Sequence, residues 1–100
     1  MTRAEQIYNN FEQFNLQNPQ VWELFEKYAM MIIQRGFSHY GAAAVFERIR
    51  WHVQIETIGQ EFKLNNNFCA HYARKFDDKY PDYAGFFRCR RLVSENKNAK

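Results

Sequence analysis

The sequence predicts a single, mainly α-helical domain, and three observations support this expectation. First, 100 residues leave room for only one domain. Second, 46% of the residues are hydrophobic and 18% are aromatic, enough for a core rich in rings. Third, apolar side chains recur every three or four residues along most of the chain, as in amphipathic helices. We expect a bundle of four to five helices over residues 1–93 and a flexible tail over residues 94–100.

The first helix is expected over residues 3–14. Thr2 and Glu5 have the spacing of a capping box, in which each side chain bonds to the other's backbone N–H. The turn formers Asn15 and Asn18 follow, and they indicate where this helix ends.

The second helix is expected over residues 19–35, at the centre of the core. Asn18 is a favourable capping residue, and Pro19 suits the first helical position, where its missing N–H is no loss. A wide apolar stripe follows, and Gly36 is a typical helix stop.

A third helix is expected from a cap at Ser38 to about Gln54. The end of this segment supports two interpretations. Residues 53–57 and 62–64 also alternate between apolar and polar side chains, which would suit one short β-hairpin. A helix extended to Ile58 and followed by a loop fits the same residues equally well.

The fourth helix begins after three asparagines, residues 65–67, which supply a cap. An aromatic stripe repeats every four residues from Phe68 to Phe76 and would face the core. Pro81 is expected to stop this helix, and residues 82–87 would form one or two further turns.

The charge of the chain is unevenly distributed. The net charge is +3, but residues 1–61 sum to −2 and residues 62–100 to +5. A basic C-terminal part indicates an anionic partner, most often nucleic acid. A solvated charged face and a loose basic tail would produce the same numbers.

Three blocks of residues lie between Trp22 and Arg91. They are Gly36-Phe37, Tyr40-Gly41 and Phe46-Glu47-Arg48-Ile49-Arg50-Trp51; Phe62-Lys63-Leu64-Asn65-Asn66-Asn67 and Tyr72-Ala73-Arg74; and Pro81-Asp82, Ala84-Gly85-Phe86-Phe87 and Arg90. With these blocks the chain resembles small proteins encoded by bacteriophages and prophages. The resemblance implies a phage or prophage origin and expression in bacterial cytoplasm. It implies no activity and assigns no functional residue.

The fourth helix has features of a DNA-reading helix. Asparagine and arginine on one exposed face suit contacts to base edges, while Lys63 and Lys79 would hold phosphates and His71 would lie toward water. However, about eleven residues separate Gln54 from Asn66, more than the ~3–4 of a helix-turn-helix. The candidate nucleic-acid-binding residues are Lys63, Asn66, Asn67, Arg74, Lys75, Arg88, Arg90 and Arg91.

A second charged group lies around Trp51. Glu47, Arg48 and Arg50 border this tryptophan, and an intramolecular salt bridge that fixes helix packing is the favoured interpretation. Trp51 itself is expected between two faces, where its N–H could reach a partner.

Other function classes lack a motif. The sequence has no phosphate-binding glycine loop, nucleophile elbow or paired-histidine motif, so we expect no enzyme, metal or cofactor. Cys69 and Cys89 read as reduced thiols. No signal peptide or membrane-length apolar run is present, which favours a cytoplasmic protein without a membrane partner.

Two functions remain as hypotheses. The first is a small phage-type nucleic-acid-binding or regulatory protein. The second is a phage-encoded interaction module that inhibits a host defence or metabolic factor. Ten Phe, six Tyr and two Trp exceed what one small core readily hides, and the surplus would suit a host protein or a homodimer.

Overall fold

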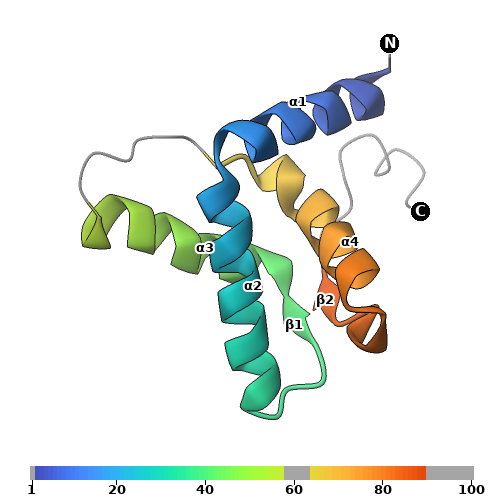
Figure 1. Ribbon diagram of the computed structural model, residues 1–100. Coiled ribbons are helices and arrows are strands. Elements are labelled where there is room, and N and C mark those ends of the chain that lie inside the picture. Colours follow the sequence, from blue (N-terminus) through green and yellow to red (C-terminus); the bar gives the residue numbers. More distant parts are fainter. Residues whose placement is uncertain (1, 58–63, 90–100) are drawn as a thin grey trace, which may run out of the picture.

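The computed structural model describes residues 2–57 and 64–89, and this part of the chain is mainly helical (Figure 1). The α-helices are α1 (Arg3–Gln17), α2 (Pro19–Gln34), α3 (Ala42–Trp51) and α4 (Cys69–Lys79). Shorter turns are π-helical at His52–Glu56 and 3-10 at Asn66–Phe68 and Pro81–Tyr83. Two short strands, β1 (Tyr40–Gly41) and β2 (Phe87–Arg88), complete the fold. The predicted mainly α class is therefore confirmed, while the predicted tail lies outside the described residues.

The helices surround one aromatic core. In Figure 1, α1 lies across the start of α4, α2 runs down the middle, and α3 and α4 lie on either side of α2. The largest fully buried side chains include Phe25, Phe46, Tyr72 and Phe76. Phe25 stacks on Tyr72 with ring centroids 5.7 Å apart, and Phe46 meets Tyr72 edge-on at 5.6 Å. The predicted stripe of α4 thus faces the core.

The capping box at the start of α1 is confirmed. The Thr2 hydroxyl accepts from the Glu5 N–H at 3.1 Å, and the Glu5 carboxylate accepts from the Thr2 N–H at 2.9 Å. The helix continues three residues past its predicted end, because the Asn18 backbone N–H still donates to the Phe14 carbonyl.

The predicted capping role of Asn18 in α2 is wrong. Its side-chain amide donates backward to the Phe14 carbonyl at 3.1 Å, so it closes α1 and leaves α2 without a side-chain cap. Pro19 does occupy the first turn of α2, as predicted. The helix ends at Gln34, one residue before the predicted end, with Arg35 as its C-cap, and Gly36 adopts a left-handed φ of 98°.

Ser38 does not cap the third helix. Its hydroxyl pairs with His39, and the chain forms β1 before α3 begins after Gly41. The hairpin interpretation is also wrong for residues 53–57, since His52–Glu56 continues α3 as a π-helical turn. Residues 58–63, on which the rest of both interpretations depended, lie outside the described part.

The end of the described chain returns to the centre of the fold. The Asn65 side chain accepts from the Asn67 N–H at 2.8 Å and caps the 3-10 turn before α4. Pro81 follows α4 as predicted, but the expected further helical turns shrink to Pro81–Tyr83. The chain then enters β2, which pairs in parallel with β1, Tyr40 opposite Phe87.

Candidate functional site

A groove between α1 and α4 brings together two of the predicted binding residues. It holds a pocket of about 410 Å³, lined on the α4 side by His71, Arg74 and Lys75. On the α1 side Tyr8, Phe11 and Asn15 complete the wall. This volume lies within the ~300–1,000 Å³ range of small-molecule pockets.

His71 is the least expected member of this groove. Helical periodicity predicts that its side chain points toward water, but only 7% of its surface is exposed. The reason is α1: Phe11 stacks on the imidazole at 5.2 Å, and Tyr8 stands edge-on to it at 5.3 Å. Neither ring nitrogen has a hydrogen-bond partner among the described residues.

The surroundings of His71 favour a neutral imidazole. Burial lowers its pKa, and the nearby positive charge of Arg74 lowers that pKa further. A neutral imidazole carries one N–H donor and one nitrogen acceptor. Leaving such a buried polar group unpaired costs about 1–3 kcal/mol. The groove therefore holds unused hydrogen-bonding capacity.

Asn15 adds a second unused group to the same pocket. Its side-chain carbonyl oxygen is buried and has no hydrogen-bond partner among the described residues. At the rim, the Tyr8 hydroxyl donates to Glu12 at 2.8 Å, which raises the pKa of Tyr8. Tyr8 remains 43% exposed, so an aromatic ring is available at the mouth of the pocket.

Lys75 extends the positive side of the groove toward α2. Its ammonium lies 5.0 Å from the centre of the Trp22 ring, within cation–π range. Arg74 is exposed and has no ion-pair partner among the described residues. Glu12 and Asp78 also line the pocket, so its rim carries both signs of charge.

Lys79, which was expected to hold phosphate, instead joins α4 to α2. Its ammonium lies 2.6 Å from the Glu26 carboxylate, which also accepts from the Tyr80 hydroxyl at 2.7 Å. Burial alone would raise the pKa of Glu26, but these two hydrogen bonds outweigh it and lower that pKa. Lys79 therefore serves helix packing.

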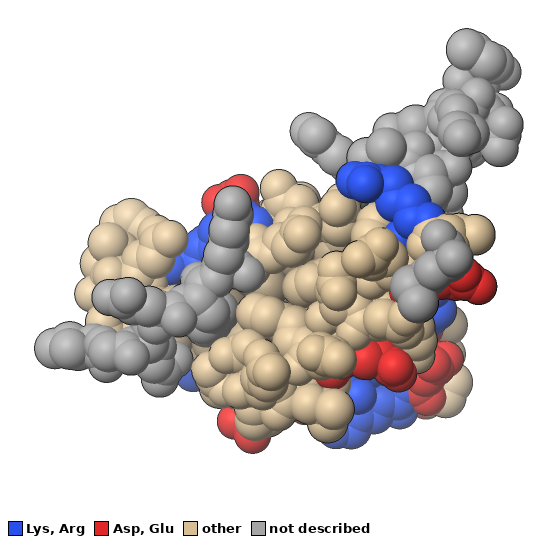
Figure 2. Space-filling model, turned by 90° about the horizontal axis from the view of Figure 1, so that it is seen from above, with Lys and Arg blue, Asp and Glu red and all other residues tan. Residues whose placement is uncertain are grey.

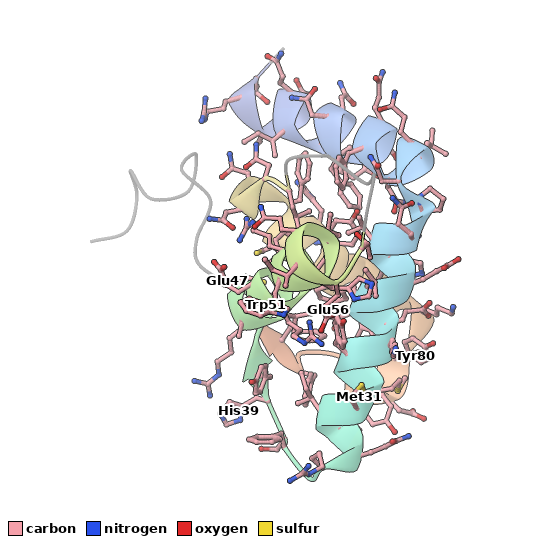
Figure 3. All side chains as sticks on the ribbon, turned by 90° about the vertical axis from the view of Figure 1, so that its left-hand side faces the viewer. Met31, His39, Glu47, Trp51, Glu56 and Tyr80 are labelled. Carbon is pink, nitrogen blue, oxygen red and sulfur yellow. The ribbon has the colours of Figure 1, made fainter. Side chains whose placement is uncertain are left out.

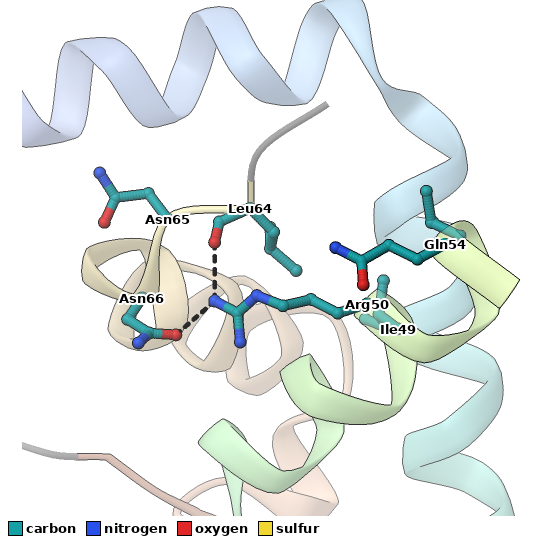
Figure 4. Close-up of a pocket in the computed structure, with 7 residues that line it drawn as sticks. Ile49, Arg50, Gln54, Leu64, Asn65 and Asn66 are labelled. Atoms are coloured by element: carbon teal, nitrogen blue, oxygen red, sulfur yellow. Dashed lines mark hydrogen bonds between the residues drawn. The ribbon is translucent and has the colours of Figure 1, made fainter. Parts of the chain in front are cut away.

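Asn66 belongs to a second pocket, of about 550 Å³, between α3 with the turn that continues it and residues 64–66, which precede α4 (Figure 4). The Arg50 guanidinium there donates to the Leu64 carbonyl at 2.7 Å and to the Asn66 side chain at 2.5 Å. Arg50 also pairs with Glu47 at 3.1 Å, so an intramolecular salt bridge is present as expected, but it lies within α3 and does not join two helices. The side-chain oxygen of Asn66 is thus already bonded to Arg50 within the protein.

The other described candidates, Asn67 and Arg88, do not line the groove. Asn67 lies in the 3-10 turn before α4, and Arg88 is exposed on β2. Lys63, Arg90 and Arg91 fall outside the described residues. The structure therefore brings Arg74 and Lys75 to one pocket and places Asn66 in another. Tyr8, Phe11 and Asn15 of α1, which no sequence pattern predicts as site residues, complete the first pocket.

The charges of the described residues balance. This part of the chain carries nine Lys and Arg and nine Asp and Glu, so the net positive charge belongs to the other residues. On the face seen in Figure 2, the coloured basic atoms form separate groups, some beside acidic ones. Binding of an anion would therefore depend on local geometry more than on a broad basic surface.

Other kinds of site find little support in the described residues. No group of three or more His, Cys, Asp or Glu side chains there could hold a metal ion. Burial, and next the nearby Cys89, raise the pKa of the Cys69 thiol to about 12, so the thiol stays protonated at neutral pH. Within the same part of the chain, every helix is too short or too polar to cross a membrane.

The fold and groove define a small helical protein with one lined pocket between its first and fourth helices. No family model matches the chain, and neither a curated protein nor a solved structure matches it significantly.

Proposed function

We propose that this chain is a small phage-type protein that binds nucleic acid through the groove between α1 and α4. The observation that carries the proposal is the meeting of Arg74 and Lys75 with the exposed ring of Tyr8 at one pocket. Proteins that bind single strands combine cations that track the phosphates with aromatic rings on which bases stack. The groove supplies both kinds of side chain.

A single strand suits this groove better than a double helix does. A recognition helix needs a broad free face to enter the major groove. On α4, five residues are buried, and Tyr8 and Phe11 of α1 contact His71 on one flank. Its exposed positions are Arg74, Asp78 and Lys79, of which Lys79 is already paired with Glu26. A strand lying along the helix pair would reach Arg74 and Lys75 without inserting α4.

The test is a titration of labelled single-stranded DNA, single-stranded RNA and duplex DNA at several salt concentrations. Neutralising one phosphate of a single strand changes the slope of log K against log salt by about −0.7. Arg74→Ala should therefore flatten the slope by about that amount. Arg35→Ala removes the same charge from an exposed site at the far end of α2 and should change nothing.

Two results would overturn the proposal. One is the absence of binding to any of the three nucleic acids at low salt. The other is an equal loss of affinity in Arg74→Ala and Arg35→Ala, because binding would then respond to total charge and not to the groove.

One observation favours the second candidate, an interaction module that inhibits a host factor. Trp51 and Ile55 are 56% and 61% exposed and stand four residues apart, on α3 and the turn that continues it. Met31 of α2 is 51% exposed, and both Met31 and Trp51 are seen in the view onto the α3 side (Figure 3). Exposed tryptophan is enriched among residues that dominate protein interfaces.

This second function predicts a partner that survives nuclease treatment. The tagged protein should retain a bacterial protein after nuclease digestion of the lysate, and Trp51→Ala should release it. Retention that is lost with nuclease, or that is unchanged in Trp51→Ala, would count against this surface.

A further inference from the structure

The groove between α1 and α4 contains two buried polar groups that have no hydrogen-bond partner among residues 2–57 and 64–89. His71 is 7% exposed, and both of its ring nitrogens lack a hydrogen-bond partner among the described residues. The Asn15 carbonyl oxygen is buried and unpartnered in the same way. Both side chains line one pocket of about 410 Å³. Because buried polar groups in proteins are nearly always paired, two such groups at one pocket favour a polar occupant.

The hydrogen-bonding pattern defines the edge that such a ligand must present. The Asn15 oxygen can only accept, so the ligand needs a donor opposite it. A neutral His71 offers one donor and one acceptor, so the ligand needs at least one complementary group there. The Watson–Crick edge of a nucleobase carries donors and acceptors side by side. In a duplex this edge is already paired, so only an unpaired base could offer it.

The mouth of the pocket suits a flat ring with an attached phosphate. Phe11 already stacks on the His71 ring, with planes 28° apart, so the aromatic surface left for a base is the exposed ring of Tyr8, which stands edge-on to His71. Aromatic side chains of this kind stack on bases. Arg74 and Lys75 stand on the same wall, where they would meet the phosphate of a bound nucleotide.

A base can reach His71 only if a covering side chain moves, since the ring nitrogens are buried and Tyr8 contacts the imidazole from the exposed mouth of the pocket. Tyr8 is held by an exposed hydrogen bond to Glu12 and by ring contacts with Phe11 and His71. A hydrogen bond exposed to water is readily exchanged for one with solvent. The ring could then swing outward and stack on the incoming base.

We infer that this pocket binds one unpaired nucleotide, with the base edge on His71 and Asn15 and the phosphate on Arg74 and Lys75. The inference rests on the proposed function and adds to it the recognition of a single base, which an electrostatic contact alone does not provide.

The experiment uses the four ribonucleoside monophosphates as probes and the full chain as the receptor. Nitrogen chemical shifts of the imidazoles, read by NMR, report directly on the ring nitrogens of His71. At least one nucleotide should shift them, and the parent nucleoside should bind more weakly because it lacks the phosphate. Affinities come from calorimetry on the same samples.

Two variants separate the pocket from the rest of the surface. His71→Phe keeps a ring between Tyr8 and Phe11 but removes both nitrogens, and it should weaken nucleotide binding about tenfold. His39→Phe makes the same change at an exposed histidine outside the groove and should leave the affinity unchanged. If His71→Phe does not fold, the imidazole shifts of the unaltered protein still decide the matter.

The outcomes distinguish this inference from the broader function. Strand binding that depends on Arg74, with no effect of nucleotides on His71, would overturn the nucleotide pocket alone. Nucleotides that shift His71, with no strand bound at low salt, would overturn strand binding and leave the pocket. If N-acetyltyrosinamide shifts His71 and nucleotides do not, the occupant is a peptide side chain and the inference is wrong.

Discussion

Lowering the pH should destabilise this protein through His71. In the unfolded chain an imidazole titrates near pH ~6.5. In the fold, burial and the charge of Arg74 hold the pKa of His71 below its ordinary value. As the pH falls through ~6.5, His71 takes up a proton in the unfolded state but stays neutral in the folded state. The free energy of unfolding must therefore fall as the pH is lowered. Above pH ~6.5, His71 is neutral in both states and adds no pH dependence to the stability.

The size of the effect follows from one proton. A difference of one bound proton changes the unfolding free energy by at most about 1.4 kcal/mol per pH unit. The loss continues until the pH reaches the lowered pKa of His71 in the fold, where both states are protonated and the slope ends. Glu26 and Glu56 also have lowered pKa values, but their contribution is lost only below about pH 4.5, in a separate window.

The assay is urea denaturation followed by circular dichroism between about pH 7.5 and 5. His71→Phe retains the contacts of a ring with Tyr8 and Phe11 and removes the titration. The difference between the two proteins isolates His71 from His39 and His52, which both retain. Stability curves that run parallel over this range would refute the reasoning, since His71 would then accept its proton equally in both states.

Three further predictions concern the stability of the fold, and urea denaturation tests each. Thr2→Ala breaks the capping box of α1 and should cost about 1 kcal/mol, whereas Thr2→Ser should cost little; equal losses would exclude the cap as the cause. Tyr72→Phe removes a buried hydroxyl without a partner in the described structure and should gain about 1 kcal/mol; a loss would reveal a partner for it. Arg50→Met cuts the bonds to the Leu64 carbonyl and Asn66 and should cost about 2 kcal/mol. Unchanged stability in that variant would show that solvent replaces those bonds.

The helices were predictable because their signals are local. Thr2 and Glu5 are three residues apart, and Pro19 marks the start of α2 by its own chemistry. The helix ends were less predictable. Asn18 lies between α1 and α2 and could cap either helix, and its side chain bonds to the Phe14 carbonyl of α1. The two strands have no recognisable sequence pattern, because each is only two residues long. Their pairing joins Tyr40 to Phe87, which is far along the chain.

The candidate site was predictable only on one side. Arg74 and Lys75 could be selected from the exposed face of a helix, since periodicity alone defines that face. Their neighbours on α1 could not, because no pattern states which helix crosses α4 or at which residue. For the same reason periodicity predicts an exposed His71 side chain, although Tyr8 and Phe11 of α1 cover it.

The parallel pair of β1 and β2 bears on the order in which the protein folds. It joins Tyr40 to Phe87, so α3 and α4 are enclosed in the loop that this pairing closes. The entropy lost on closing so long a loop must be met before its contacts contribute, which slows such steps relative to helix formation. We expect the helices to form and collapse first, with Phe86 and Phe87 entering the core last. During synthesis, the core would then remain incomplete beside the β1–β2 pair until β2 has left the ribosome.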